Sequence, residues 1–91
     1  MMSKILVIDD EAAIRRVLKK ILTEESKDYI VEEAEDGLEA MEKIKEEDYD
    51  LVLCDIKMPK MDGIEVLEAT KKIKPETPFV MISGHGDLET A

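Results

Sequence analysis

The order of the sequence patterns constrains the fold most, because short apolar runs alternate with amphipathic stretches along the whole chain. The runs lack polar alternation, which is typical of strands that are covered on both faces. They predict four strands, at Lys4–Asp9, Tyr29–Ala34, Leu51–Asp55 and Pro78–Ser83. The stretches between them predict three helices, at Glu11–Glu24, Gly37 to about Glu47, and Ile64–Ile73. Strands that alternate with helices through short loops predict an α/β domain with a parallel sheet and right-handed crossovers.

The first two predicted helices are amphipathic, and each has an apolar face that could pack on a sheet. The first carries five apolar residues at helical spacing, namely Ile14, Val17, Leu18, Ile21 and Leu22. The second has the expected buried stripe Leu38, Met41 and Ile44. We expect Asp36 to be the N-cap of the second helix, with Glu39 three residues later as in a capping box.

Composition excludes several classes of function. The chain of 91 residues is long enough for one domain, and it carries 23 acidic against 13 basic residues, a formal net charge of −10. No basic stripe offsets this charge, so we expect no direct contact with nucleic acid. No apolar run approaches the roughly 20 residues that span a bilayer, so we expect no membrane partner. The lone Cys54 lies inside an apolar run, which predicts a buried, inert thiol and fits a reducing, cytoplasmic location.

Polar side chains gather where the predicted strands end. Asp9 and Asp10 end the first apolar run, Asp55 ends the third, and Ser83 ends the fourth. The carboxyl ends of parallel strands meet at one edge of a sheet, where ligands of open α/β sheets bind. We therefore expect three carboxylates and one hydroxyl to lie close together there.

Crowded carboxylates repel one another unless a positive charge lies among them. Mg²⁺ prefers oxygen ligands and usually takes only one or two carboxylates directly. We expect Asp10 and Asp55 to supply these, with the backbone carbonyl of Lys57 in reach and Asp9 acting through water. Asp55 then has a second carboxylate oxygen that can attack phosphorus. Ser83 could donate its hydroxyl to a phosphoryl oxygen, although a hydroxyl at this position could equally cap a turn.

Several motifs together resemble one protein family, the receiver domains of bacterial two-component response regulators. The motifs are Ile8-Asp9-Asp10-Glu11, Asp55-Ile56-Lys57-Met58-Pro59, Met61-Asp62-Gly63 and Ser83-Gly84-His85-Gly86-Asp87. The last motif particularly resembles receivers of the nitrogen-regulation type, whose full-length members activate transcription through an ATPase attached to a DNA-binding domain. An Asp-Asp pair or a proline-glycine loop alone would be a weak signal, but the combination is highly specific.

The resemblance implies a flavodoxin-like, doubly wound parallel sheet with strand order 2-1-3-4-5. It also implies that a histidine kinase transfers a phosphoryl group to Asp55, with Mg²⁺ held by Asp10, Asp55 and the Lys57 carbonyl. Ser83 matches the switch hydroxyl of the family. The chain would then be a phospho-acceptor that regulates an output such as transcription, with at most weak self-phosphorylation or self-dephosphorylation, and not an enzyme.

The sequence departs from the family at its carboxyl end. The family has a fifth strand ending in a lysine and a nearby switch aromatic, and neither occurs before Ala91. We therefore expect residues 1–91 to form a single receiver domain that is incomplete at its C-terminus, with the fifth strand and last helix missing. The fourth strand and the first helix would then expose apolar surface, which predicts a homodimer or marginal stability.

Two other functions stay open at this point. One is a Mg²⁺-dependent hydrolase that forms an aspartyl phosphate, as in the haloacid-dehalogenase pattern with its nucleophile on the first strand. Here Asp9 is followed by Asp10, then Glu11 and Ala12, a run that does not match that pattern. The other is an interaction module that never receives phosphate, which an intact set of three acids makes less favourable.

Overall fold

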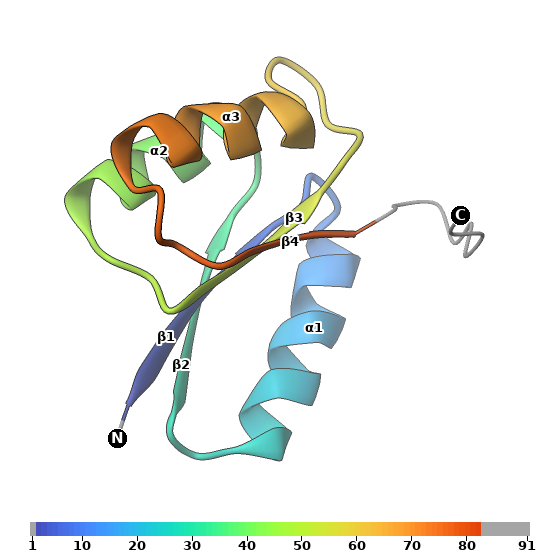
Figure 1. Ribbon diagram of the computed structural model, residues 1–91. Coiled ribbons are helices and arrows are strands. Elements are labelled where there is room, and N and C mark those ends of the chain that lie inside the picture. The colour runs from blue at the N-terminus through green and yellow to red at the C-terminus, as the bar shows by residue number, and fades with distance from the viewer. Residues whose placement is uncertain (1, 83–91) are drawn as a thin grey trace.

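The computed structural model describes residues 2–82, which form a parallel sheet with helices on both faces (Figure 1). In chain order the elements are β1 (Ser3–Ile8), α1 (Ala12–Glu25), β2 (Tyr29–Ala34), α2 (Gly37–Glu46), β3 (Leu51–Asp55), α3 (Gly63–Ile73) and β4 (Phe79–Ile82). The sheet order is β2-β1-β3-β4 and all pairs are parallel. The predicted flavodoxin-like α/β fold is confirmed over these residues. None of the described helices is both long and apolar enough to cross a membrane.

The predicted element bounds are confirmed within one or two residues. Two strands, Tyr29–Ala34 and Leu51–Asp55, have the bounds that the sequence predicts. The first strand ends at Ile8 rather than Asp9, because the Asp9 carboxylate accepts a hydrogen bond from the Glu11 amide, 2.9 Å away, and turns the chain into α1. The last predicted strand is described from Phe79 to Ile82, and Ser83 lies outside the described residues.

The larger part of the core lies between the sheet and the pair α2 and α3, which lie together on one face (Figure 1). Strand residues that point to this face are almost fully buried, among them Leu6, Ile8, Val52 and Cys54. Helix α2 buries Gly37, Ala40, Met41 and Ile44, which follow helical spacing. The expectation that Leu38 is buried is wrong, since 56% of it is exposed. Leu38 is one position past the buried row, so the helix turns it away from the sheet.

Helix α1 covers the opposite face of the sheet incompletely. Leu18 and Leu22 pack against a smaller cluster around Ile5, Val7 and Val31. No residue of α1 is buried. The other apolar residues of the predicted stripe are 39–56% exposed, namely Ile14, Val17 and Ile21. The expectation that this helix exposes apolar surface is therefore confirmed.

Side chains cap the amino ends of α2 and α3. The Asp36 carboxylate accepts from the Glu39 amide, 2.8 Å away, as predicted. The Glu39 carboxylate, however, accepts from the amide of Glu35 and not from that of Asp36, so the reciprocal bond is shifted by one residue. A complete capping box occurs in α3, where Asp62 and Glu65 accept from each other's amides at 2.9 and 3.0 Å. This capping box in α3 was not predicted from the sequence.

Gly63 begins α3 directly against the chain that follows β3. A Cβ atom on residue 63 would collide with the carbonyl oxygen of Asp55 and lie 2.9 Å from Cα of Ile56. The Gly63 amide also donates to the Ile56 carbonyl at 2.8 Å, which fixes this close approach. The start of α3 therefore depends on the absence of a side chain at residue 63.

We expect Gly63→Ala to lower the free energy of unfolding by about 2 kcal/mol, because backbone atoms of Asp55 and Ile56 must move to admit the new methyl group. Urea unfolding followed by circular dichroism measures this change. The matched control is Ile64→Ala, which alters an exposed side chain one residue later and should change the free energy of unfolding by less than about 0.5 kcal/mol. Equal stability of the two variants would contradict the close approach.

Candidate metal centre

Three carboxylates meet at the carboxyl edge of the sheet, as predicted from the sequence. Asp9 and Asp10 follow β1 and Asp55 ends β3, and these two strands are neighbours in register. Each residue offers one carboxylate oxygen, and the three oxygens lie within 4.8 Å of one another. Asp9 and Asp55 are only 3% and 2% exposed, whereas Asp10 is exposed. The cluster thus has a buried floor and one side that solvent reaches.

Asp9 is held by its backbone as well as its side chain. Its amide donates to the Ala34 carbonyl of β2 at 3.1 Å. Its carboxylate accepts from the Glu11 amide at the start of α1, at 2.9 Å. Its carbonyl accepts from Nη1 of Arg15 at 2.7 Å. The turn that carries Asp9 and Asp10 is therefore anchored to both β2 and α1.

Asp55 lies at the start of a constrained loop. The Lys57 amide donates to Oδ1 of Asp55 at 3.3 Å, so the Lys57 backbone lies beside this carboxylate. The Ile56 amide continues the sheet by donating to the Ile82 carbonyl at 3.1 Å. Asp55 also pairs in register with Ile82, the last described residue of β4. These contacts place the Lys57 amide beside Asp55, the role of the Lys57 carbonyl as a ligand stays a prediction, and Ser83 lies outside the described residues.

The loop after Asp55 rests on the amino end of α2. Lys60, at its tip, has a φ of 69°, a left-handed conformation that few non-glycine residues adopt. Nζ of Lys60 lies 3.8 Å from Oδ2 of Asp36. A Cβ atom on Gly37 would lie 2.6 Å from Cβ of Met61, so the two backbones pack closely. The loop is thereby held against a second helix, a contact that no sequence pattern indicated.

The electrostatics of the cluster favour a bound cation. Burial raises the pKa of the Asp9 carboxyl above its ordinary value, and the charges of Asp55 and Asp10 raise it further. The hydrogen bond from the Glu11 amide and the charge of Arg15 lower this pKa, but they do not outweigh burial. Oxygen donors held this close and only partly neutralised are the set that Mg²⁺ binds, so the residues fit this ion.

Cys54 precedes Asp55 and is fully buried, as predicted. Burial raises the pKa of its thiol to about 12, and the nearby charges of Asp55 and Asp9 contribute. The thiol is therefore protonated at neutral pH and is a poor nucleophile.

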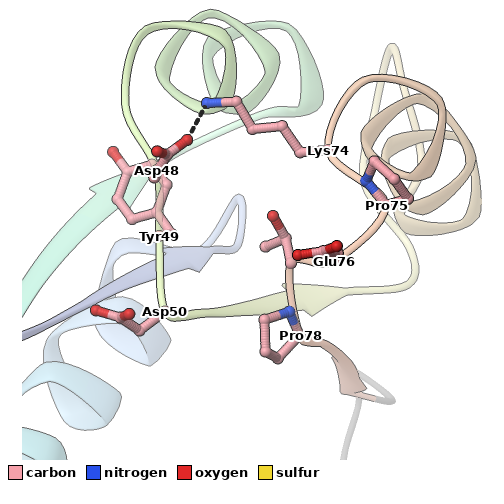
Figure 2. A pocket seen from close by; sticks show the side chains of 8 residues that line it. Asp48, Tyr49, Asp50, Lys74, Pro75, Glu76 and Pro78 are labelled. Carbon is pink, nitrogen blue, oxygen red and sulfur yellow. Dashed lines mark ion pairs between the residues drawn. The ribbon is translucent and has the colours of Figure 1, made fainter.

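A hollow of about 490 Å³ lies at the other end of β3, away from the acidic cluster (Figure 2). Its walls include Asp48, Tyr49, Asp50 and Lys74. Lys74 and Asp48 form an ion pair in this hollow, with Nζ of Lys74 2.8 Å from Oδ1 of Asp48. This contact lowers the pKa of the Asp48 carboxyl. Asp50 and Glu76 also line the hollow, so this ion pair offsets only one of its three acids.

Comparisons with known proteins agree with this geometry. Residues 5–91 match the family described as the response regulator receiver domain. The transcriptional regulatory protein ResD of Bacillus subtilis is 47% identical over 85 residues, which are 93% of this chain and 34% of ResD. The chain thus spans about a third of that relative.

Solved structures share the fold at similar identity. The response regulator TrrA of Thermotoga maritima, in complex with Mg²⁺-BeF, superposes with a TM-score of 0.87 at 40% identity, over 93% of this chain and 72% of TrrA. NtrX of Brucella abortus, in complex with ATP, has a TM-score of 0.85 at 40% identity, over 98% of this chain and 20% of NtrX. From the family match, the shared fold and the acidic cluster, the chain belongs to the response regulator receiver domain family.

Proposed function

We propose that this receiver accepts a phosphoryl group on Asp55 from the phosphohistidine of a histidine kinase, in the presence of Mg²⁺. The observation that carries the proposal is the meeting of three carboxylates within 4.8 Å at the carboxyl ends of β1 and β3. In this proposal Asp10, Asp55 and the Lys57 carbonyl would bind the ion directly, and Asp9 would act through water. The Mg²⁺–BeF complex of TrrA, a protein with the same fold, supports the choice of ion.

The chemistry follows from the surroundings of Asp55. The Lys57 amide holds Oδ1 of Asp55, and the other carboxylate oxygen attacks phosphorus. A P–O bond forms as the P–N bond of the phosphohistidine breaks, and the imidazole departs with the bonding electrons. Bound Mg²⁺ would balance the negative charge of the acids and of the transferred group. We also propose that Ser83 donates its hydroxyl to a phosphoryl oxygen.

The regulated output is proposed from the relatives. ResD is a transcriptional regulatory protein, and NtrX was solved with ATP. We propose that this domain likewise controls an attached or associated output such as transcription, through an ATPase and DNA-binding domain, in the cytoplasm. With a formal net charge of −10 the domain would not contact nucleic acid itself. It would act as a phospho-acceptor that loses its phosphate slowly to water, and not as an enzyme with turnover.

The proposal is tested with acetyl phosphate, and separately with beryllofluoride, each with Mg²⁺. We expect acetyl phosphate to add one phosphoryl group, located at Asp55 by mass spectrometry, and Asp55→Asn to abolish it. The control Asp48→Asn removes an acid at the other end of the sheet and should leave labelling unchanged. Turnover of a phosphate ester would instead favour the hydrolase. A folded protein that responds to neither reagent would favour the interaction module.

We expect Asp9→Asn to stabilise the Mg²⁺-free protein at neutral pH, because the raised pKa of Asp9 means that the fold disfavours its charge. Asparagine keeps the oxygen that accepts from the Glu11 amide. The same variant should lose most of the stabilisation that Mg²⁺ gives to the wild type. Thermal unfolding with EDTA and with Mg²⁺ measures both effects.

Asp48→Asn is the control for the direction of the stability change. Lys74 lowers the pKa of Asp48, so the fold favours the charge of that carboxylate. This variant should not become more stable in EDTA, and it should respond to Mg²⁺ as the wild type does. A less stable Asp9→Asn protein with an unchanged response to Mg²⁺ would contradict the proposed role of Asp9.

We also propose that the domain forms a homodimer through α1 and the edge of the sheet. Ile14, Val17 and Ile21 form an exposed apolar row on α1. Within the described residues β4 pairs only with β3, and its Val80 side chain is exposed. A second copy offers the same helix and the same strand edge, so both surfaces could be covered symmetrically.

Sedimentation velocity over a range of concentrations tests this dimer. We expect Val17→Glu, an exposed substitution in the middle of the α1 row, to shift the wild-type dimer toward monomer by at least tenfold in dissociation constant, which is about 1.4 kcal/mol. Glu68→Gln, on the exposed side of α3, is the control and should leave the dimer unchanged. A wild type that stays monomeric at all concentrations would exclude the proposal.

A further inference from the structure

The fold places the cation of Arg15 next to the acidic cluster, and its side chain is only 15% exposed. It makes two hydrogen bonds in different directions. Nη1 donates to the Asp9 carbonyl at 2.7 Å, and Nε donates to Oε1 of Glu33 on β2 at 2.9 Å. Arg16, the next residue on α1, is exposed. The two arginines have the same charge but entirely different surroundings.

The bond to the Asp9 carbonyl affects the direction of Asp10. The Asp9 carbonyl and the Asp10 amide belong to one planar peptide unit, so holding the carbonyl sets the plane from which Asp10 begins. The Asp9 amide and carboxylate have their own partners, Ala34 and Glu11. Arg15 supplies the partner for the carbonyl. It thereby completes the restraint on the turn between β1 and α1.

Glu33 keeps the guanidinium of Arg15 in this position. An arginine beside three carboxylates could pair with them directly and compete with a cation for their oxygens. The bond from Nε to Glu33 directs the guanidinium toward β2 instead. Nζ of Lys19 lies 3.8 Å from Oε2 of Glu33, so a second positive charge lies beside this carboxylate. The bonded groups of Arg15 are thus a backbone carbonyl and Glu33.

We propose that Arg15 is a positioning residue for the cation site, acting through the Asp9 carbonyl to orient Asp9 and Asp10. The inference rests on the proposed function, since it concerns the same Mg²⁺ site. The charge of Arg15 alone would oppose binding of a cation. Loss of Arg15 therefore separates the two effects by sign, because lost orientation weakens Mg²⁺ binding and lost charge strengthens it.

The experiment measures Mg²⁺ dissociation constants by calorimetry for the wild type, Arg15→Gln, Arg15→Lys and Arg16→Gln. Unfolding in EDTA confirms that each protein is folded at the titration temperature. We expect Arg15→Gln to bind Mg²⁺ about tenfold more weakly, the scale found for residues that orient metal ligands. Arg15→Lys keeps the charge, but lysine lacks the planar guanidinium that donates to both Glu33 and the Asp9 carbonyl. This variant should therefore also bind Mg²⁺ more weakly. Arg16→Gln removes the same charge one residue away and should bind within twofold of the wild type.

Three results would overturn the proposal. Tighter binding by Arg15→Gln, with Arg15→Lys equal to the wild type, would show that only charge matters. An unchanged dissociation constant in an Arg15→Gln protein of lower stability would show that Arg15 only supports the fold. If neither the wild type nor Arg16→Gln binds Mg²⁺, the proposed cation site itself fails and the inference fails with it.

A second variant keeps the test decisive if Arg15→Gln does not fold. Glu33→Ala removes the partly exposed carboxylate on β2 that holds the Arg15 guanidinium, and residue 15 remains an arginine. We expect severalfold weaker Mg²⁺ binding, because the guanidinium is then able to turn toward the carboxylates of Asp9 and Asp10. Added to Arg15→Lys, Glu33→Ala should weaken binding by less than it does in the wild type. Equal effects of Glu33→Ala in both backgrounds would show that it does not act through residue 15.

Discussion

The repulsion among Asp9, Asp10 and Asp55 is the interaction on which the rest of this structure depends. Two neighbouring parallel strands end at the same edge, so the chain cannot separate the acids that follow β1 and β3 without changing the sheet order. Burial makes this repulsion more costly, as the raised pKa of Asp9 shows. The hydrogen bonds around the cluster, from Glu11 and Lys57, orient these carboxylates without removing their charge.

Most of the fold could be predicted from the sequence, because unbroken apolar runs indicate the strands and apolar residues at helical spacing indicate the helices. The unbroken apolar run at residues 51–54 predicts a strand covered on both faces, and β3 has the predicted bounds Leu51–Asp55. Leu38 shows the limit of this reasoning. It fits an apolar row of α2 as well as Ala40 does, and only the packing of that helix on the sheet decides which of the two is buried.

The members of the site could be predicted, but their restraints could not. Asp9, Asp10 and Asp55 each follow an apolar run, so topology alone brings them together. The contact of Arg15 with the Asp9 carbonyl has no sequence signature, because Arg15 and Arg16 look identical in an amphipathic pattern and differ only in which one the turn directs inward. The packing of Gly37 on Met61 likewise joins segments that are distant in sequence, and no local spacing encodes it.

The buried thiol of Cys54 has a chemical consequence for its neighbour. A phosphorylated Asp55 would be a mixed anhydride, and a thiolate one residue away is the kind of nucleophile that cleaves such a bond to leave a thioester. A thiol whose pKa is held at about 12 supplies almost no thiolate at neutral pH. The lifetime of the anhydride would then be determined by attacking water and by partner proteins, and not by the domain's own sulfur.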